Sequence, residues 1–390
     1  MMESEEQRRR KIVIAVFSHI EAYPPSLNAV HHLAEQFDEV HILHRNVMKS
    51  EWNYPSNVVV IPFGEYVEAE KVKYLPLYKK VGDFLKFGIA LKALIGKQKP
   101  SVILVYDAPA FALLNLFSWS KIKQLSARIW YHNHDVMPEN ELPKYSIMWM
   151  TRKLELRYFK RINYFSLPNS ARLSYFPFKQ LGIDPIIIPN YPSKNFFGKF
   201  TADHKNQEVI RIIFQGQISP SNKLDIFIDL LTHSIRGKTI ELHLAGPVDE
   251  GYQKQLIDRA RILNVEGRLF MYGRLPYSKL PALTASCHIG LAVYGEHNTM
   301  VRTMSTASNK IFEYASVGLP VLINKREDME KEFIDFPWIH FAVIQKQELL
   351  DSLDKIISSY AQYALLAKRD FEEKVNFEKF FLPVLQIIKN

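Results

Sequence analysis

The chain has 390 residues, of which 47% are hydrophobic and 23% are charged, a balance that predicts a globular protein of two or three domains. The single cysteine, Cys287, excludes an internal disulfide and favours a reducing, cytoplasmic location. No apolar run approaches the roughly 20 residues that span a bilayer, and the polar opening MMESEEQRRR does not resemble a signal peptide. We therefore expect a cytoplasmic protein that contacts a membrane, if at all, only peripherally.

The net charge of +9 is unevenly distributed along the chain. Residues 1–200 contain 27 Lys and Arg against 18 Asp and Glu, whereas residues 201–390 contain 23 of each kind. All of the excess positive charge therefore lies in the N-terminal half. This asymmetry predicts that an anionic surface or ligand faces that half.

Buried strands alternate with helices along the first half of the chain. The first strand, 11–18, is followed by a loop over HIEAYPPSLNAV and by a helical pattern that ends at Phe37. Further strands are predicted at 39–45, 57–63, 101–107, 127–135, 164–171 and 185–190, and helices at 84–97, 109–125 and 146–161. Residues 1–191 are interpreted as an N-terminal, acceptor-binding domain, and the turn-rich residues 192–207 as a linker.

The alternation restarts after the linker. Strands are predicted at 209–217, 239–247, 268–274, 288–295 and 320–324, and helices at 223–234, 252–264, 277–286 and 307–318. Residues 208–370 form the predicted C-terminal domain, and residues 371–390 a final helix that can dock on either domain. Two such series indicate an α/β protein with two doubly wound, Rossmann-like domains of parallel strands.

Ligands of open parallel sheets bind beyond the carboxyl ends of the strands, and two such sheets make the cleft between them the default site. The candidate donor-binding residues at strand ends of the second half are Gly216, Gln217, Gly246, Gly273, Arg274 and Tyr294. After the strand that ends near Gly216, Lys223 opens a predicted helix whose N-terminus can attract a phosphate. The alternative is an ordinary turn in which Ser221 or Asn222 caps the helix.

The stretch STASNKIFEYASVGLPVL predicts a helix, a glycine stop and a buried strand. Ser308 or Asn309 can cap this helix, and Lys310 lies in its first turn, where a cation opposes the helix dipole unless an anion binds there. Glu313 follows one turn later, and its carboxylate can accept hydrogen bonds from the two hydroxyls of a ribose. The alternative is a Lys–Glu pair on a solvated helix face, worth about 0.2–0.5 kcal/mol.

KIFEYASVGLPVL resembles the signature of retaining GT-B glycosyltransferases of family 4, and the resemblance extends over roughly residues 210–325. It implies that Glu313 binds the nucleotide ribose and that Lys223 contacts the diphosphate, which Lys310 and the N-terminus of its helix can also bind. The family often has a second glutamate eight positions before the first, where this chain has Ser305. The arginine commonly found after the first-strand glycine is replaced here by Gln217. Both departures bear on how the donor sugar is recognised.

The segment WYHNHDVMPEN resembles a second segment of the same family, with His134 facing the donor sugar. An imidazole there can bind a sugar hydroxyl or the departing phosphate, and Asp135 is a candidate on the acceptor side. The alternative is a loop with solvated histidines. Ser26 and Asn28 lie in the first strand–helix loop, which in the family approaches donor and acceptor, or which is a plain connection here.

Two stretches of the first half, 71–88 and 149–165, mix lysine or arginine with aromatic and aliphatic residues. Each can be a solvated helix face over a core, but together with the local positive charge they suggest contact with an anionic membrane. No RNA-binding motif accompanies them, so no nucleic-acid partner is expected.

The sequence therefore predicts a metal-independent hexosyltransferase that uses a nucleoside diphosphate sugar and needs no cofactor. The acceptor is expected to be a glycan or a lipid-linked molecule of surface polysaccharide or glycoconjugate synthesis, and transfer is expected to retain anomeric configuration. No Asp-x-Asp motif that would hold a metal ion occurs in the chain. Two alternatives stay open: a non-catalytic sugar-nucleotide-binding subunit and a sugar-nucleotide epimerase.

Overall fold

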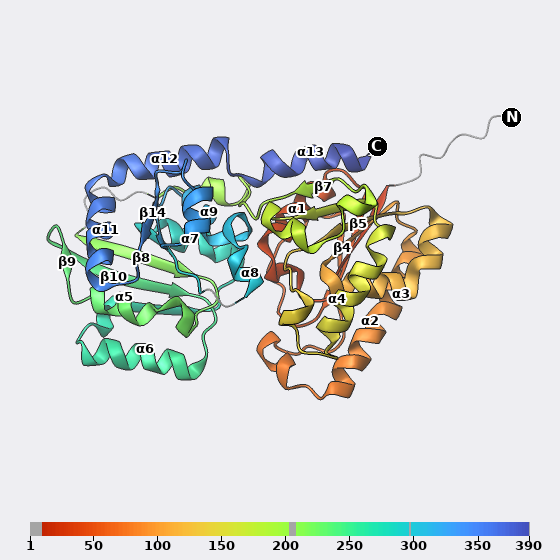
Figure 1. Ribbon diagram of the computed structural model, residues 1–390, viewed down its shortest axis with the longest axis horizontal. Coiled ribbons are helices and arrows are strands. Elements are labelled where there is room, and N and C mark those ends of the chain that lie inside the picture. The colour runs from red at the N-terminus through yellow and green to blue at the C-terminus, as the bar shows by residue number, and fades with distance from the viewer. Residues whose placement is uncertain (1–9, 203–207, 296–297, 390) are drawn as a thin grey trace. The chain divides into compact units, whose positions relative to one another are not determined.

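The computed structural model describes residues 10–202, 208–295 and 298–389, and its contacts divide the chain into two compact units (Figure 1). Unit 1 consists of the chain up to Pro189, the segment Asn298–Ala307 and the chain from Phe380 onward. Unit 2 consists of Asn190–His297 and Ser308–Lys379. The segment 298–307 thus groups with unit 1, although the sequence predicts it within the second domain. Part of the predicted linker, residues 203–207, lies outside the described residues.

Unit 1 is built on a parallel sheet with the strand order β3-β2-β1-β4-β5-β6-β7. Its strands are β1 (Lys11–Val16), β2 (Glu39–Arg45), β3 (Val58–Phe63), β4 (Val102–Tyr106), β5 (Arg128–His132), β6 (Tyr164–Leu167) and β7 (Pro185–Ile187). The chain proceeds outward from β1 to β3 on one side and from β4 to β7 on the other. The switch in direction between β1 and β4 is where open α/β sheets bind their ligands.

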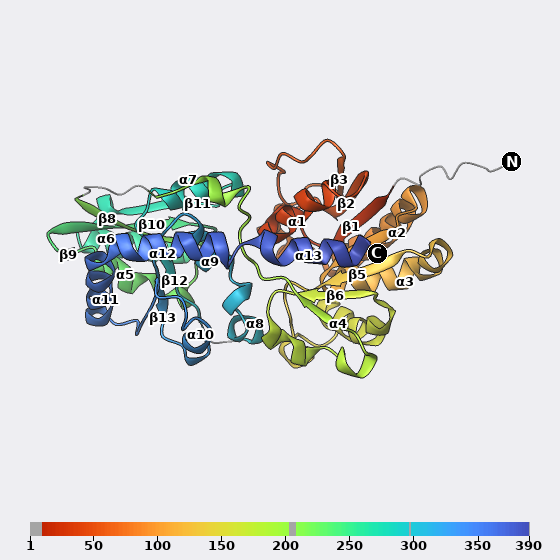
Figure 2. The same ribbon diagram turned by 90° about the horizontal axis from the view of Figure 1, so that it is seen from above.

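Helices cover both faces of this sheet. One face carries α2 (Leu77–Gln98), α3 (Asp107–Leu125) and α4 (Ile147–Tyr158), whose side chains form a common core with the strands. The other face carries α1 (Pro24–Ala34) and most of α13 (Phe377–Lys389) (Figure 2). The ring of Phe381 in α13 lies 5.9 Å from Trp130 of β5 and 6.1 Å from His32 of α1. A short helix, α8 (Thr299–Arg302), completes the described part of unit 1.

Unit 2 contains a second sheet with the strand order β11-β10-β8-β12-β13-β14. Its parallel strands are β8 (Val209–Gln215), β10 (Lys238–Ala245), β11 (Leu269–Gly273), β12 (Ile289–Ala292), β13 (Val321–Asn324) and β14 (Ile339–Ala342). The short β9 (Ser234–Ile235) pairs antiparallel with β10. Strands β9 and β14 were not predicted from the sequence.

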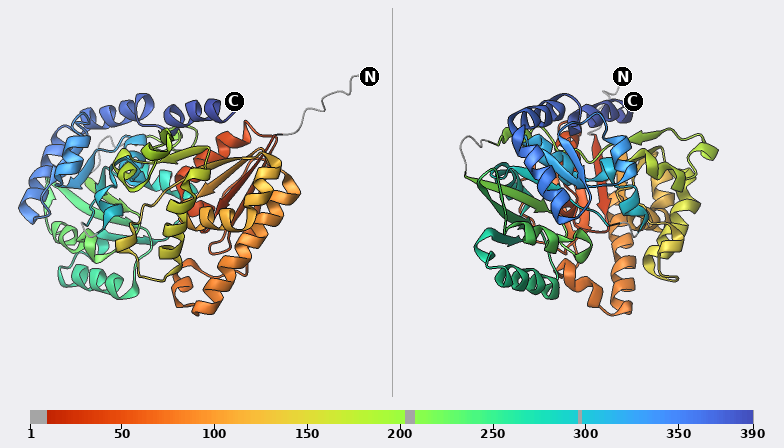
Figure 3. Two further views of the ribbon diagram at one scale, coloured as in Figure 1. Left: turned by 45° about the vertical axis from the view of Figure 1, so that its right-hand side comes forward. Right: turned by 60° about the vertical axis from the view of Figure 1, so that its left-hand side comes forward.

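The helices of unit 2 also form two layers. On one face, α5 (Leu224–Leu230), α6 (Glu250–Ile262) and α11 (Lys346–Ser358) share a core with the strands. The opposite layer holds α7 (Leu280–Ala285), α9 (Asn309–Ser316) and α12 (Tyr360–Glu373), and Figures 1 and 3 show α12 and α6 on opposite sides of the sheet. The remaining helix of this unit in the described range is α10 (Glu327–Glu332).

Two helix boundaries differ from the prediction. Helix α1 begins at Pro24, so Ser26 and Asn28 lie in a helix and not in a loop. Proline is compatible with the first helical turn because its missing N–H would have no partner there. The predicted final helix is two helices, because Asn376 interrupts it: its amide donates to Phe371 O (2.9 Å), and its Oδ1 accepts from the backbone N–H of Lys379 (3.1 Å).

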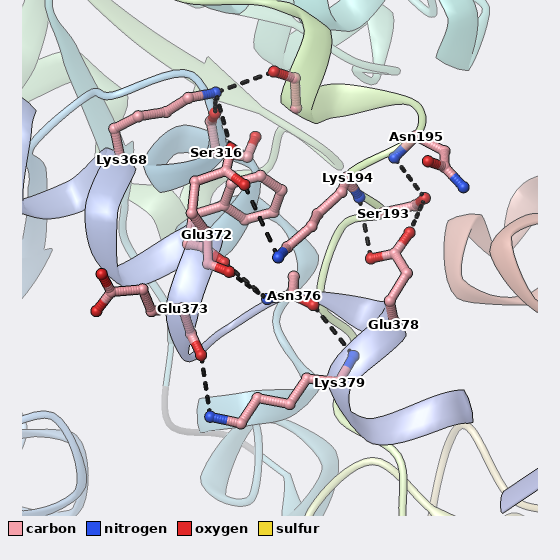
Figure 4. Close-up of polar contacts among 12 residues, drawn as sticks. Ser193, Lys194, Asn195, Ser316, Lys368, Glu372, Glu373, Asn376, Glu378 and Lys379 are labelled. Atoms are coloured by element: carbon pink, nitrogen blue, oxygen red, sulfur yellow. Dashed lines mark hydrogen bonds and ion pairs between the residues drawn. The ribbon is translucent and has the colours of Figure 1, made fainter. Parts of the chain in front are cut away.

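Helix α12 fixes the C-terminal end of α9 (Figure 4). The ammonium group of Lys368 donates to the carbonyls of Ser316 (2.7 Å), Gly198 (3.1 Å) and Phe200 (3.2 Å). A cation at this end of a helix also interacts favourably with the helix dipole. Helix α9 is therefore anchored at one end, which positions its N-terminus at the carboxyl edge of the sheet.

Candidate functional site

Helix α9 lies unusually close to the sheet of unit 2. A Cβ added to Gly290 in β12 would lie 2.1 Å from the ring of Tyr314, so only glycine permits this approach. The hydroxyl of Tyr314 accepts the N–H of Gln215 (3.0 Å) and donates to Leu291 O (3.2 Å), which joins the ends of β8 and β12. Gly318, with φ +86°, ends the helix in the left-handed conformation that favours glycine.

The carboxylate of Glu313 is buried, with only 4% of the residue exposed. It accepts hydrogen bonds from the Tyr277 hydroxyl (3.0 Å) and from the side-chain amide of Gln215. Burial raises the pKa of Glu313 to about 7, although these hydrogen bonds and Lys310 act in the opposite direction. The interpretation of Glu313 as part of an exposed pair on a solvated helix face is therefore wrong.

Lys310 lies one turn before Glu313 against aromatic rings. Its ammonium nitrogen is 4.0 Å from the ring centre of Phe214 and 5.2 Å from that of Tyr294. A Cβ on Gly216 would lie 3.3 Å from this nitrogen, so the glycine leaves room for the lysine. Burial lowers the pKa of Lys310 to about 8. Within the described part of the chain, no carboxylate or carbonyl forms an ion pair or hydrogen bond with its ammonium group.

The first turn of α9 has no side-chain cap. Ser308 occupies the N-cap position, but its hydroxyl bonds to the hydroxyl of Tyr294. The Oδ1 atom of Asn309 is buried and has no hydrogen-bond partner among the described residues. The prediction that Ser308 or Asn309 caps this helix is therefore wrong, and the backbone N–H groups of the first turn remain available to an anion.

The loop after β8 packs against the loop after β10. A Cβ on Gly246 would lie 1.8 Å from the carbonyl oxygen of Gly216, so the two backbones are in direct contact. The N–H of Gly216 donates to Ala245 O (2.9 Å), and the amide of Gln217 donates to Pro247 O (3.2 Å). These contacts continue the pairing of β8 and β10 beyond their ends.

Lys223 is the N-cap residue of α5 and has a left-handed backbone (φ +49°). The alternative in which Ser221 or Asn222 caps α5 is wrong, because Asn222 forms a capping box with Ser219 on the preceding turn. The amide of Asn222 also donates to Val293 O (2.9 Å) and so attaches this loop to the end of β12. The side chain of Lys223 is exposed.

The other predicted donor residues are more dispersed. Gly273 ends β11 with φ +63° and has open space around it, and the exposed Arg274 follows. Ser305 belongs to the segment that groups with unit 1, where its hydroxyl bonds to the amide of Asn169. The structure thus links Gly216 to Lys310, Lys310 to Tyr294 and Tyr294 to Ser308 in a chain of contacts. Gly273 and Ser305 do not belong to this chain.

In unit 1, His134 is enclosed and not solvated. Its Nε2 lies 2.8 Å from the hydroxyl of Ser26, and its ring lies 4.6 Å from the rings of Tyr23 and Tyr106. Burial holds the pKa of His134 well below its usual value, so the imidazole is neutral at pH 7. Asn28, on the same helix as Ser26, is also buried.

Sequence reasoning missed Asp107, which follows β4 directly. One carboxylate oxygen accepts the backbone N–H groups of His134 (2.7 Å) and Asp135 (3.3 Å), which ties the loop after β5 to the end of β4. The backbone of Asp107 is left-handed (φ +62°). This conformation is costly for a residue with a side chain, and residues held in it cluster at functional sites. Its position at the end of the strand SVILVY was the signal that could have revealed it.

Residues 199–370 match the family model described as Glycosyl transferases group 1. This part of the chain is therefore similar to the glycosyl transferases group 1 family. With two Rossmann-like units, each built on a parallel sheet, the whole chain has the GT-B fold, as the sequence predicted. A comparison with curated proteins found no match.

Solved structures with this fold include sucrose-phosphate synthase from Thermosynechococcus elongatus, with a TM-score of 0.71, 12% identity and 98% of each chain covered. HepE from Anabaena, in complex with UDP and glucose, has a TM-score of 0.66 and 14% identity over 98% of this chain and 100% of that chain. WaaG, described as a glycosyltransferase involved in lipopolysaccharide biosynthesis, has a TM-score of 0.62 and 11% identity over 97% of this chain and 100% of that chain.

Proposed function

We propose that this protein transfers a sugar from a nucleoside diphosphate sugar to a glycan or lipid-linked acceptor. One observation carries the proposal: the buried Glu313 and the unpaired Lys310 lie one turn apart on a helix whose N-terminus has no side-chain cap. A buried carboxylate and a half-buried cation that are not paired with each other are costly, and a ligand with a diol and a diphosphate offsets both costs.

Each part of the donor has a matching group in unit 2. The ribose diol donates to the carboxylate of Glu313, whose oxygens each have capacity for a further hydrogen bond. The diphosphate binds the first-turn N–H groups of α9 and the ammonium of Lys310, with Lys223 as a further cation. The match of this region to the family of glycosyl transferases and the UDP in the HepE structure support a nucleotide donor.

The transfer proceeds with retention of anomeric configuration and without a metal ion. The leaving diphosphate is stabilised by Lys310, Lys223 and the helix N-terminus, which supply the positive charge that a metal ion supplies in other transferases. His134, neutral and buried in unit 1, offers a hydrogen bond and not a charge. Product NMR tests the stereochemistry, and an inverted product contradicts retention. Activity that EDTA abolishes and added Mg²⁺ restores contradicts metal independence.

A thermal-shift panel of UDP, GDP, ADP and CDP sugars tests the donor site. We expect the sugar nucleotides of one base to raise the Tm of the wild-type protein. The Glu313→Ala substitution should abolish this shift in Tm. Asp370→Asn is a matched control, because Asp370 is also a buried carboxylate of unit 2, bonded to the indole of Trp338 (3.0 Å). A shift that survives in Glu313→Ala contradicts the ribose assignment.

Turnover distinguishes the proposed activity from its alternatives. A transferase consumes the donor when an acceptor is present, whereas an epimerase converts it without any acceptor. A binding subunit gives tight binding and no turnover with any acceptor. The hydroxyl of Ser305 is bonded to Asn169, so an engaged serine stands where the family often has its second glutamate.

The proposal includes contact with the anionic inner face of a membrane through unit 1. Among the described residues, no helix is both long and apolar enough to cross a membrane. The start of α2 and the turn before it, which can be followed in orange in Figure 3, expose Tyr74 (76%), Leu77 (72%) and Tyr78 (79%). The lysines of this stretch are Lys71, Lys73, Lys79, Lys80 and Lys86. Exposed apolar side chains among lysines match the chemistry of an anionic lipid surface.

Co-sedimentation with vesicles tests this contact. We expect binding to vesicles with about one-third anionic lipid, little binding to neutral vesicles, and loss of binding in Leu77→Ser/Tyr78→Ser and at high salt. Ile262→Ser is a matched control in unit 2, since Ile262 is 79% exposed. Equal binding by the double variant and the wild type contradicts this contact.

A further inference from the structure

A pocket of about 280 Å³ lies in unit 1 at the carboxyl ends of β1, β2, β4 and β5. It is at the point where the strand order changes direction, where open α/β sheets bind ligands. Its apolar wall includes Phe17, Tyr23, Met137 and Met148. Its charged and amide side chains are Arg45, Asp107, Asn133, Asp135, Arg152 and Glu155, and Ser18 adds a hydroxyl.

The two arginines of the pocket differ in their partners. Arg152 is bonded to Glu155 and to the carbonyl of Tyr175 (2.6 Å), so its charge is neutralised within the protein. Arg45 lies with its guanidinium carbon 4.8 Å from the ring centre of Phe17. No described residue forms an ion pair or side-chain hydrogen bond with that guanidinium. Asp83 acts on this charge only beyond ion-pair distance, so Arg45 places a half-buried positive charge without a directly bonded partner among the described residues in the wall of the pocket.

In contrast to the donor Arg45, three other side chains of the pocket are hydrogen-bond acceptors. Each of them has at least one oxygen atom to which no described residue donates. The Oδ1 atom of Asn133 is buried and has no partner among the described residues, and only 2% of the residue is exposed. Nothing in the described ranges donates to the side chain of Asp135. Asp107 uses one carboxylate oxygen for two backbone N–H groups, and its second oxygen has no partner in the part of the chain described.

We infer that this pocket binds a polyhydroxylated molecule that carries one anionic group, a phosphate or a carboxylate, and that this molecule is the acceptor. Hydroxyl groups donate to Asn133, Asp135 and Asp107, and the anionic group binds Arg45. The apolar C–H face of a sugar ring packs against Phe17 and Tyr23. The assignment as acceptor rests on the proposed sugar transfer, but the binding chemistry does not.

Calorimetric titration of the full chain without nucleotide tests the inference. The probes are the 6-phosphates of glucose, galactose and mannose, the matching uronates, the neutral sugars and inorganic phosphate. We expect at least one anionic sugar to bind roughly 10- to 100-fold more tightly than its neutral sugar and than phosphate alone. The phosphate and uronate series show which anion is preferred. Absence of any such preference overturns the inference.

Variants assign the binding to this pocket. Arg45→Gln should remove the preference for the anionic sugar, and Arg45→Lys should retain part of it. Asp135→Asn should lower the affinity for charged and neutral sugars alike. Arg236→Gln is the matched control, because Arg236 lies in unit 2 and pairs with Asp354 (2.8 Å). Wild-type affinity in Arg45→Gln overturns the inference. Nucleotide binding measured on the same samples separates this outcome from a failure of the proposed donor site.

Discussion

The carboxyl edges of the two sheets hold charged groups in opposite ways. In unit 2, the cation and the carboxylate lie on one helix, one turn apart, in a continuous stretch of sequence. In unit 1, Arg45, Asp107 and Asp135 come from the ends of three different strands, and only the fold brings them to one pocket. The first arrangement can be recognised from a motif, whereas the second requires the topology of the sheet.

The two edges also differ in how rigidly they are built. In unit 2, Gly246 packs against the backbone of Gly216 and Gly290 packs against the ring of Tyr314, and neither contact leaves room for a side chain. In unit 1, the loop after β5 is held by hydrogen bonds to Asp107. We therefore expect substitutions in unit 2 to act mainly through sterics and buried charge, and substitutions in unit 1 through polar contacts.

The largest effect is expected at Gly246. Gly246→Ala should lower the free energy of unfolding by roughly 3 kcal/mol or more, because its Cβ would overlap the carbonyl of Gly216. Gly273→Ala is the matched control: its φ of +63° is strained for alanine, but its surroundings are open, so a loss of about 1 kcal/mol is expected. Urea unfolding measures both, and equal losses would contradict the close contact.

Next in size is the pH dependence of stability that Glu313 causes. Its pKa rises from 4.5 to about 7 on folding, so the native state binds more protons than the unfolded state between these values. Stability from this group is complete below pH 4.5 and is lost as the pH rises toward 7, by at most about 3 kcal/mol. Glu313→Gln should flatten this part of the unfolding profile. An unchanged profile contradicts the buried environment of the carboxylate.

A smaller effect, on ligand affinity, is expected at Lys310. Lys310→Met should weaken nucleotide binding about 10- to 100-fold at pH 7, as expected for a charge-assisted hydrogen bond to a phosphate. Because its pKa in the free protein is about 8, wild-type affinity should fall as the pH rises above that value, while the variant shows no such fall. Calorimetric titration at pH 7 and pH 9 measures this. If the nucleotide affinities of the wild type and the variant change equally with pH, the phosphate does not bind Lys310.

The smallest effect is expected at Asn376, between α12 and α13. Asn376→Ala removes the cap of α13 and the hydrogen bond to Phe371, and should cost about 1 kcal/mol without changing nucleotide affinity. Asn376→Asp keeps the capping oxygen and should recover part of the loss. A change in nucleotide affinity in either variant would show that this junction influences the donor site.

The sequence predicted the two series of parallel strands because continuous apolar runs between turn residues are typical of strands buried on both faces. It did not predict β14, α11 or the break at Asn376, since these depend on packing and on one side-chain amide. In the candidate site, Glu313 and Lys310 were recognisable from their motif. Arg45 and Asp107 have no feature in the local sequence that marks them, other than a position at the end of a strand. The prediction of a side-chain cap on α9 was wrong because the hydroxyl of Ser308 bonds to Tyr294, which precedes the helix by more than a turn.

The most direct test of the central claim is a crystal structure of the protein with the nucleoside diphosphate sugar that the thermal-shift panel selects. We predict that both ribose hydroxyls lie within hydrogen-bonding distance of the Glu313 carboxylate, and that the diphosphate contacts Lys310 and the N-terminus of α9. A nucleotide bound at another place, or bound here with its ribose away from Glu313, would contradict the account.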